Sequence, residues 1–167
     1  MYYYTDVAGV PAAFVGTLFL VVRIIDAVSD PVMGMIVDNT RSRFGKFRPW
    51  IILGTVINSL ALLALFSAHL FSGSQLLLFV TVTYIVWGLT YTIMDIPFWS
   101  MVPALSARRE ERERLVVWPR LFASIAWTIV GSYGLASIAF LGKGDEGRGF
   151  LLLSGLIIIA FLASALI

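Results

Sequence analysis

Long apolar stretches alternate with short polar segments along the whole chain. Between Pro49 and Met94 the sequence contains no Asp, Glu, Lys or Arg, and a helix needs only about 20 apolar residues to cross the hydrocarbon core of a bilayer. The pattern therefore predicts an all-α membrane protein. The expected membrane helices cover residues 11–37, 49–71, 75–104, 115–141 and 148–167.

The composition excludes several classes of protein. The chain of 167 residues is 59% hydrophobic and 13% charged, whereas a soluble domain carries about 25% charged residues. The absence of cysteine excludes disulfides and thiolate chemistry, and a single histidine, His69, disfavours a zinc site. No nucleophile is paired with a base in the sequence, so we expect neither an enzyme nor a cofactor.

The positive charges cluster in two of the predicted loops. The first loop, residues 38–48, contains Arg41, Arg43, Lys46 and Arg48, and the second, residues 106–114, contains Arg108, Arg109, Arg112 and Arg114. The positive-inside rule places both loops on the cytoplasmic side of the membrane. We expect Arg41, Arg43, Gly45 and Lys46 to brace the cytoplasmic ends of two helices around a turn centred on the glycine. The basic pI of about 9.2 then reflects topology, and nucleic acid is not an expected partner.

The two ends of the sequence are typical of a segment from a larger bundle. Tyr2, Tyr3 and Tyr4 are typical of the aromatic belt that closes a membrane helix, yet no apolar stretch precedes them. The last predicted helix extends to Ile167 without a closing anchor. These features predict a fragment that holds about five helices of a larger transmembrane protein.

One predicted helix carries three charged residues inside the membrane. Arg23, Asp26 and Asp30 have the spacing i, i+3 and i+7, which places them on one face of a helix. Two carboxylates one turn apart repel each other unless a cation or a proton lies between them. The stripe is therefore suited to bind Na⁺, Li⁺ or H⁺, and Arg23 balances part of its charge when the site is empty. The alternative is a structural ion pair between packed helices.

The predicted helix at residues 75–104 carries a second polar face. Tyr91, Asp95 and Trp99 have the spacing i, i+4 and i+8, and Thr92 lies beside them. A carboxylate accepts hydrogen bonds from sugar hydroxyls, while an aromatic ring stacks against the C–H face of the sugar. The alternative is that the aromatic residues only pack and that Asp95 joins two helices. Arg120, near the start of its helix, either contacts a ligand or extends to the cytoplasmic interface.

Several motifs together resemble a known transporter family. They are Tyr3-Tyr4-Thr5-Asp6, Gly16-Thr-Leu-Phe19, Arg23-Ile-Ile-Asp26-Ala-Val-Ser-Asp30-Pro31, Thr40-Arg-Ser-Arg-Phe-Gly-Lys-Phe47 and Tyr91-Thr-Ile-Met-Asp-Ile-Pro-Phe-Trp-Ser100. In this order they resemble the glycoside-pentoside-hexuronide:cation symporters, and the melibiose permeases most of all. The resemblance implies the major facilitator fold, in which twelve helices form two halves. Residues 1–167 would then form most of the N-terminal half, from the end of helix I through helix VI.

The resemblance also implies roles for particular residues. The family's cation site would fall on Asp26, Asp30 and Thr92, and its sugar site on Asp95, Trp99 and Arg120, with Tyr91 beside them. Na⁺-coupled melibiose permeases resemble Ile-Asn-Asp-Pro where this chain has Val28-Ser29-Asp30-Pro31. The serine hydroxyl lies on a shorter side chain than the asparagine carboxamide and is a weaker ligand for Na⁺. Li⁺ and H⁺ are therefore candidate coupling ions together with Na⁺.

The resemblance thus implies cation-coupled symport of a galactoside such as melibiose across the inner (cytoplasmic) membrane. Another glycoside, a pentoside or a glucuronide is the alternative substrate. An alternative of a different class is a membrane module that does not transport and whose buried charges are structural.

Overall fold

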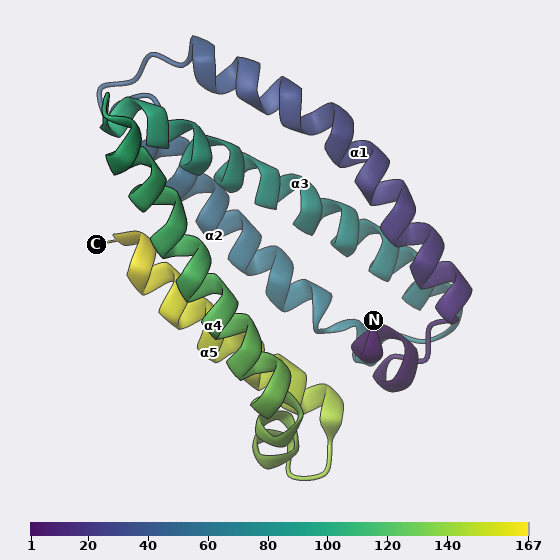
Figure 1. Ribbon diagram of the computed structural model, residues 1–167. Coiled ribbons are helices and arrows are strands. Elements are labelled where there is room, and N and C mark those ends of the chain that lie inside the picture. Colours follow the sequence, from purple (N-terminus) through teal and green to yellow (C-terminus); the bar gives the residue numbers. More distant parts are fainter. Residues whose placement is uncertain (167) are drawn as a thin grey trace.

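The computed structural model describes the backbone of residues 1–166 and the side chains of residues 1–164, and this part of the chain is entirely helical (Figure 1). Its long helices are α1 (Ala12–Asn39), α2 (Arg48–Leu65), α3 (Gly73–Leu105), α4 (Arg109–Gly142) and α5 (Glu146–Leu166). A short π-helix, η1 (Tyr3–Val7), precedes α1, and a 3₁₀ turn, η2 (Ala68–Leu70), follows α2. All five long helices have the length and apolar composition needed to cross a membrane, so the predicted all-α membrane fold is confirmed.

Some helix ends differ from the sequence-based expectation. Helix α2 ends at Leu65 rather than at residue 71, and α4 begins at Arg109, inside the segment expected to be a charged loop. The early start of α4 has an electrostatic cause. Arg109 Nε lies 2.9 Å from Glu113 Oε1 at the spacing i, i+4, and Glu110 and Glu111 occupy the first turn, where the helix dipole favours acidic groups. The expected last helix included Ile167, which lies outside the described residues.

Helix α3 occupies the centre of the bundle. It packs against α1, α2 and α4, while α5 packs against α4 and α2. Figure 1 shows α1 on one side of α3 and α4 on the other, and α3 and α4 diverge from the end where the chain passes from one to the other. A cavity lined by residues of α1, α3 and α4 lies where the helices diverge.

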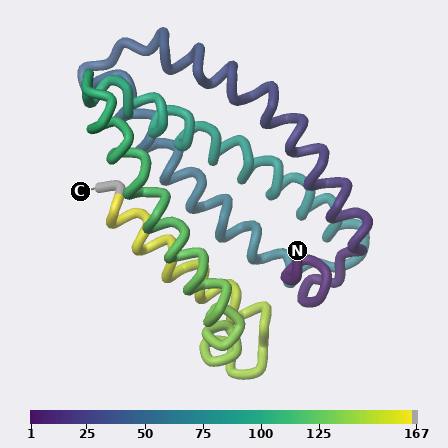
Figure 2. The backbone as a smooth tube through the Cα atoms, viewed as in Figure 1, coloured from purple at the N-terminus to yellow at the C-terminus, as the bar shows by residue number. Residues whose placement is uncertain are grey.

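Both basic loops lie at the same end of the bundle. The tube in Figure 2 places the α1–α2 link and the α3–α4 link side by side there. In the first loop, Lys46 Nζ lies 2.7 Å from Asp38 Oδ1, and Gly45 adopts a φ of 91°, which favours glycine. This arrangement agrees with a common cytoplasmic side for the two loops.

Small and polar side chains fix α2 against α3. A Cβ atom on Gly54 would lie 2.8 Å from the Met94 Cβ and 2.9 Å from its backbone nitrogen, so the two helices approach closely at this point. One turn further along, the buried Asn58 amide donates to the Trp87 carbonyl (3.0 Å) and to Thr90 Oγ1 (3.1 Å). Such interhelical hydrogen bonds stabilise helix pairs in membranes and set the position of α3.

At the opposite end, an aromatic cluster joins η1 to the link between α2 and α3 and to α5. Tyr3 is 5% exposed, and its hydroxyl donates to the Phe66 carbonyl (2.6 Å) and accepts from the backbone N–H of His69 (3.2 Å). The Tyr3 ring also lies 4.9 Å from that of Phe150 on α5. Tyr3 lies outside the membrane-length helices, and burial raises the pKa of its phenol to about 12. The protonated hydroxyl therefore remains available as a donor.

Candidate functional site

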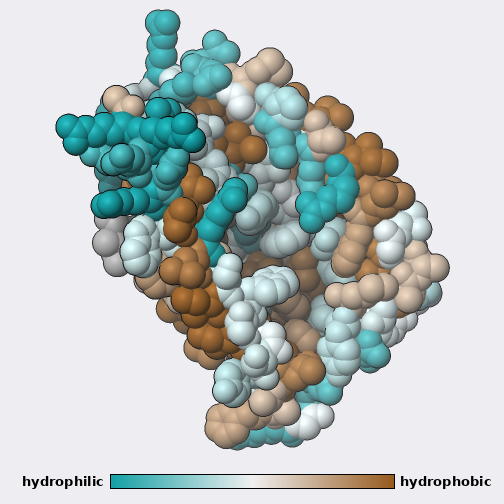
Figure 3. Space-filling view, viewed as in Figure 1, coloured by the Kyte–Doolittle hydropathy of each residue, from teal (hydrophilic) through white to brown (hydrophobic). Residues whose placement is uncertain are grey.

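A cavity of about 550 Å³ opens between α1, α3 and α4. Figure 3 shows a hollow between α1 and α4, with hydrophilic and intermediate residues on its walls, hydrophobic residues on parts of the surface to either side and a hydrophilic patch at the upper left of the view. Its volume lies within the range of about 300–1,000 Å³ that is usual for small-molecule sites. The cavity is lined by Phe19, Val22, Arg23, Asp26, Asp30, Tyr84, Trp87, Gly88, Tyr91, Thr92, Asp95, Ile96 and Trp127.

The charged stripe of α1 forms one wall of this cavity. The side chain of Arg23 is 83% exposed and that of Asp26 is 21% exposed, and Arg23 Nη1 lies 3.5 Å from Asp26 Oδ2. The other carboxylate oxygen, Asp26 Oδ1, is buried and has no hydrogen-bond partner among the described residues. A buried carboxylate oxygen without a partner carries a desolvation cost, which a bound cation or proton would offset.

Helix α3 supplies a hydroxyl to the same acidic stripe. The Thr92 hydroxyl, which is buried, donates to Asp30 Oδ1 at 3.0 Å and so joins α3 to α1. One turn away, a Cβ atom on Gly88 would lie 3.1 Å from Val22 Cγ1 and 3.7 Å from Asp26 Oδ1. The absence of a side chain at Gly88 therefore lets α1 approach α3 at the level of Asp26.

The second predicted face is only partly in the cavity. Tyr91 and Asp95 line it, whereas Trp99 and Arg120 are not among its lining residues. The Trp99 Nε1–H donates to Asp95 Oδ1 at 3.0 Å, and the Arg120 guanidinium lies 5.5 Å from the centre of the Trp99 ring. Trp99 thus holds Asp95 by a hydrogen bond within α3, and Arg120 of α4 covers the Trp99 ring.

Ser29 also lies apart from the cavity. Its hydroxyl donates to the Asp26 carbonyl of its own helix at 3.4 Å, and Ser29 is not among the lining residues. The structure therefore brings together Arg23, Asp26, Asp30 and Thr92 with Tyr91 and Asp95, and leaves Ser29, Trp99 and Arg120 outside.

Sequence reasoning missed several aromatic residues of the cavity wall. Phe19 stacks on Tyr84 with ring centres 4.8 Å apart, and Tyr84, Trp87 and Tyr91 follow one another along α3 at 5.7 and 6.0 Å. The spacing of these α3 residues relative to Asp95 is helical, and this signal was present in the sequence. Trp127 of α4 lies at i+7 from Arg120, but nothing local in the sequence indicates which helix it faces.

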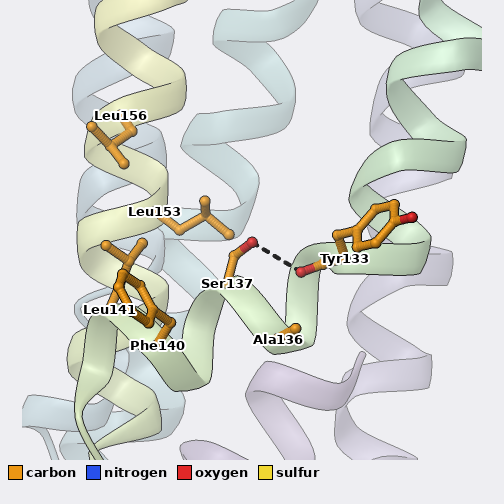
Figure 4. Close-up of a pocket in the computed structure, with 7 residues that line it drawn as sticks. All are labelled: Tyr133, Ala136, Ser137, Phe140, Leu141, Leu153 and Leu156. Carbon is orange, nitrogen blue, oxygen red and sulfur yellow. Dashed lines mark hydrogen bonds between the residues drawn. The ribbon is translucent and has the colours of Figure 1, made fainter.

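A groove between α4 and α5 differs from this cavity in chemistry. The residues drawn in Figure 4 are largely apolar, and the Ser137 hydroxyl donates to the Tyr133 carbonyl of its own helix at 2.9 Å. The groove includes no charged residue. It is suited to contact with lipid or another apolar surface.

A cavity lined by carboxylates within a bundle of membrane-length helices is the arrangement of a membrane transport protein. Residues 1–167 match the family model described as MFS/sugar transport protein, and the chain belongs to this family.

Individual relatives agree with this assignment. The chain is 38% identical over 149 residues to the "Putative glycoside/cation symporter YagG" of Escherichia coli, a match that covers 89% of this chain and 32% of the relative. It is 34% identical over 145 residues to the "Isoprimeverose transporter" of Lactiplantibacillus pentosus (87% and 30% covered). It is 37% identical over 140 residues to the "Lactose permease" of Lactobacillus helveticus (78% and 22% covered). The chain thus matches about a third or less of the length of these relatives.

Proposed function

We propose that this chain contributes the cation site and part of the sugar site of a secondary symporter in the inner (cytoplasmic) membrane. The coupling ion is Na⁺, Li⁺ or H⁺, and the substrate is a galactoside such as melibiose. The observation that carries the proposal is the single cavity that holds both the acidic stripe of α1 and the Tyr91–Asp95 face of α3. Lipid, sugar and monovalent cation are the partners that this function requires.

The acidic stripe has the chemistry of a cation site. Asp26 and Asp30 supply carboxylate oxygens, Thr92 adds a hydroxyl, and Asp26 Oδ1 is a buried acceptor without a donor among the described residues. Hard cations prefer oxygen ligands, and a proton on either carboxylate would likewise relieve the repulsion between the two groups. Arg23, which already lies near Asp26, balances the stripe when no cation is bound.

Asp95 has the chemistry of a sugar acceptor. Its Oδ1 accepts from Trp99, the carboxylate has further lone pairs with which to accept hydrogen bonds from sugar hydroxyls, and Tyr91 adds an aromatic face beside it. Trp99 donates to this carboxylate and the Arg120 guanidinium lies over the Trp99 ring, so both residues extend the Asp95 face towards α4. A charge-assisted hydrogen bond of this kind contributes about 1.5–3 kcal/mol.

The second candidate is symport of a different glycoside, such as a pentoside or a glucuronide. The relative described as an isoprimeverose transporter favours a substrate other than a galactoside. A membrane module that binds neither ion nor sugar is the remaining alternative, and it differs from both symporters in a measurable way. A structural ion pair needs no ligand, whereas a symporter binds two ligands with linked affinities.

The test separates the two sites by substitution in membranes that express the full-length protein carrying this sequence. Asp30→Asn is expected to abolish the stimulation of sugar uptake by Na⁺, Li⁺ or acid pH and to preserve sugar binding. Asp26→Asn is expected to have the same effect on cation stimulation and on sugar binding as Asp30→Asn. Asp95→Asn is expected to weaken the binding of melibiose or lactose by about 1.5–3 kcal/mol, the value of a charge-assisted hydrogen bond.

The control is Glu110→Gln, which removes an exposed carboxylate of α4 that does not line the cavity, and it should change neither binding nor uptake. Full sugar accumulation in the Asp30→Asn variant would contradict the assignment of Asp30 to the cation site. Unchanged sugar affinity in the Asp95→Asn variant would contradict the assignment of Asp95 to the sugar site.

A further inference from the structure

The two basic loops differ in how their charges are balanced. Residues 106–114 include four basic and three acidic side chains, and two of these arginines pair with glutamates at 3.6 and 2.9 Å. Residues 38–48 include four basic side chains and only one acidic side chain, Asp38. The first loop therefore has a net charge of +3, whereas the second has a net charge of +1.

Three arginines of the first loop are left without an acidic partner. Lys46 Nζ already lies 2.7 Å from Asp38 Oδ1, the one carboxylate of this loop. Arg41, Arg43 and Arg48 are exposed, and none of them forms a salt bridge among the residues that the structure describes. A free guanidinium group binds phosphate oxygens well, because its planar fork donates two parallel hydrogen bonds.

An exposed aromatic ring lies beside one of these arginines. The Arg43 guanidinium lies 4.6 Å from the centre of the Phe44 ring, and Phe44 is 60% exposed. A cation next to an apolar ring matches the boundary between lipid head groups and acyl chains, where the charge stays in the polar layer and the ring enters the apolar one. A soluble anion would gain nothing from the ring. The pair therefore favours a phospholipid over a free phosphate compound.

Hydrogen bonds hold the loop against the ends of α1 and α2. The Trp50 Nε1–H of α2 donates to Thr40 Oγ1 at 2.9 Å, and the Thr40 hydroxyl donates to the Ile36 carbonyl of α1 at 2.7 Å. Figure 2 shows that the link between these two membrane-length helices is short, and Figure 3 shows a hydrophilic patch at this end of the bundle. A loop that is already ordered loses little conformational freedom when a ligand binds.

We propose that the α1–α2 loop binds an anionic phospholipid, whose phosphate contacts the unpaired arginines Arg41, Arg43 and Arg48 while Phe44 lies against its acyl region. Each basic residue near an anionic membrane surface contributes about fivefold in affinity. Arg41 follows α1 and Arg48 begins α2, so one lipid joins the ends of both helices. None of these residues lines the cavity, so the lipid site is independent of the proposed cation and sugar sites.

The test is native mass spectrometry of the purified full-length protein carrying this sequence, titrated in detergent with dioleoylphosphatidylglycerol or dioleoylphosphatidylcholine. The parent is expected to bind the anionic lipid about tenfold or more tightly than the zwitterionic one. Arg43→Gln is expected to weaken binding of phosphatidylglycerol about fivefold and to leave phosphatidylcholine unchanged, whereas Arg43→Lys keeps the charge and should stay within about threefold of the parent. Arg148→Gln is the matched control, because Arg148 is an exposed arginine near the start of α5, at the other end of the bundle, and its loss should change neither affinity.

Several results would overturn the lipid site. They are equal affinity of the parent for the two lipids, an equal loss in the Arg43→Gln and Arg148→Gln variants, and an equal effect of Arg43→Gln on both lipids, which would mean that Arg43 only braces the loop. Displacement of phosphatidylglycerol by an equal concentration of glycerol 3-phosphate would assign the loop to soluble phosphate esters instead.

The parent protein decides if Arg43→Gln does not fold, as judged by gel filtration. Raising ammonium acetate from about 0.1 to about 1 M shortens the screening length from about 10 to about 3 Å and should remove most of the preference for phosphatidylglycerol. A preference that does not change with salt would contradict binding by exposed arginines.

Discussion

Thr92 joins the two helices that form the proposed cation site, because its hydroxyl on α3 donates to Asp30 on α1. Thr92→Val removes this donor with little change in volume. We expect the cation concentration needed for half-maximal stimulation of sugar uptake to rise about tenfold or more, since hydrogen bonds to charged groups contribute about 1.5–3 kcal/mol. Uptake at saturating cation should be largely preserved.

Thr83→Val provides the matched control on the same helix. Thr83 is also buried, but its hydroxyl donates to the Phe79 carbonyl of α3 itself at 2.7 Å, so its loss should leave the cation response unchanged. Equal cation responses of the Thr92 and Thr83 variants would show that Thr92 has no part in the ion site.

Local periodicity explains which site residues were predictable from the sequence. Arg23, Asp26 and Asp30 share a face because a regular helix places i, i+3 and i+7 together, and the structure has all three along the cavity. Trp127 was not predictable in this way, since its place in the cavity depends on how α4 crosses α3. Trp99 was assigned to the sugar from its spacing and from the family resemblance, and its bond to Asp95 lies within α3, whereas its contact with Arg120 depends on how α4 lies against α3.

At the scale of helices, the contact between α2 and α3 depends on Gly54. Gly54→Ala places a methyl group 2.8 Å from Met94 Cβ and 2.9 Å from its backbone nitrogen, and backbone cannot move aside without shifting a helix. Overpacking of this kind costs about 1–3 kcal/mol, which exceeds the gain of about 0.5–1 kcal/mol in helix propensity. We expect a lower midpoint of thermal unfolding in detergent micelles.

Gly16→Ala in α1 is the corresponding control, because a Cβ atom at Gly16 would meet no atom within 4 Å. Its unfolding midpoint should equal or exceed that of the parent. A fall of equal size in both variants would indicate a general loss of helix flexibility instead of a specific clash at Met94.

The helices themselves were easier to predict than their ends. Hydropathy indicates an apolar span because about 20 residues must match the bilayer, but it does not indicate whether a charged segment continues the helix. The segment from Arg109 to Arg114 was expected to be a loop on the basis of its charge, yet the Arg109–Glu113 pair at i, i+4 supports a helix. Composition alone does not separate these two outcomes.

For the whole molecule, the common end of the two basic loops predicts one orientation in the membrane. A single cysteine replacing Ser42 should react with a membrane-impermeant maleimide only after the cytoplasmic side is exposed. A cysteine replacing Ser74, near the start of α3 at the other end of the bundle, should react in intact cells. Both variants are made in a cysteine-free background, and this chain itself contributes no cysteine. Labelling of the Ser42 position in intact cells, and of the Ser74 position only after the cytoplasmic side is exposed, would contradict the proposed topology.

Coupling between ion and sugar is the property that separates a symporter from a bundle with structural charges. The most direct measurement is a pair of titrations on the purified full-length protein carrying this sequence: sugar affinity at increasing Na⁺, Li⁺ or H⁺, and cation affinity with and without melibiose or lactose. Linkage requires that each ligand change the affinity of the other by the same factor, and typical couplings correspond to about 5–150-fold. We predict such a reciprocal factor in the parent and its loss in the Asp30→Asn variant. Sugar affinity that is independent of all three cations, or a factor that survives in Asp30→Asn, would contradict a cation site formed by Asp26, Asp30 and Thr92.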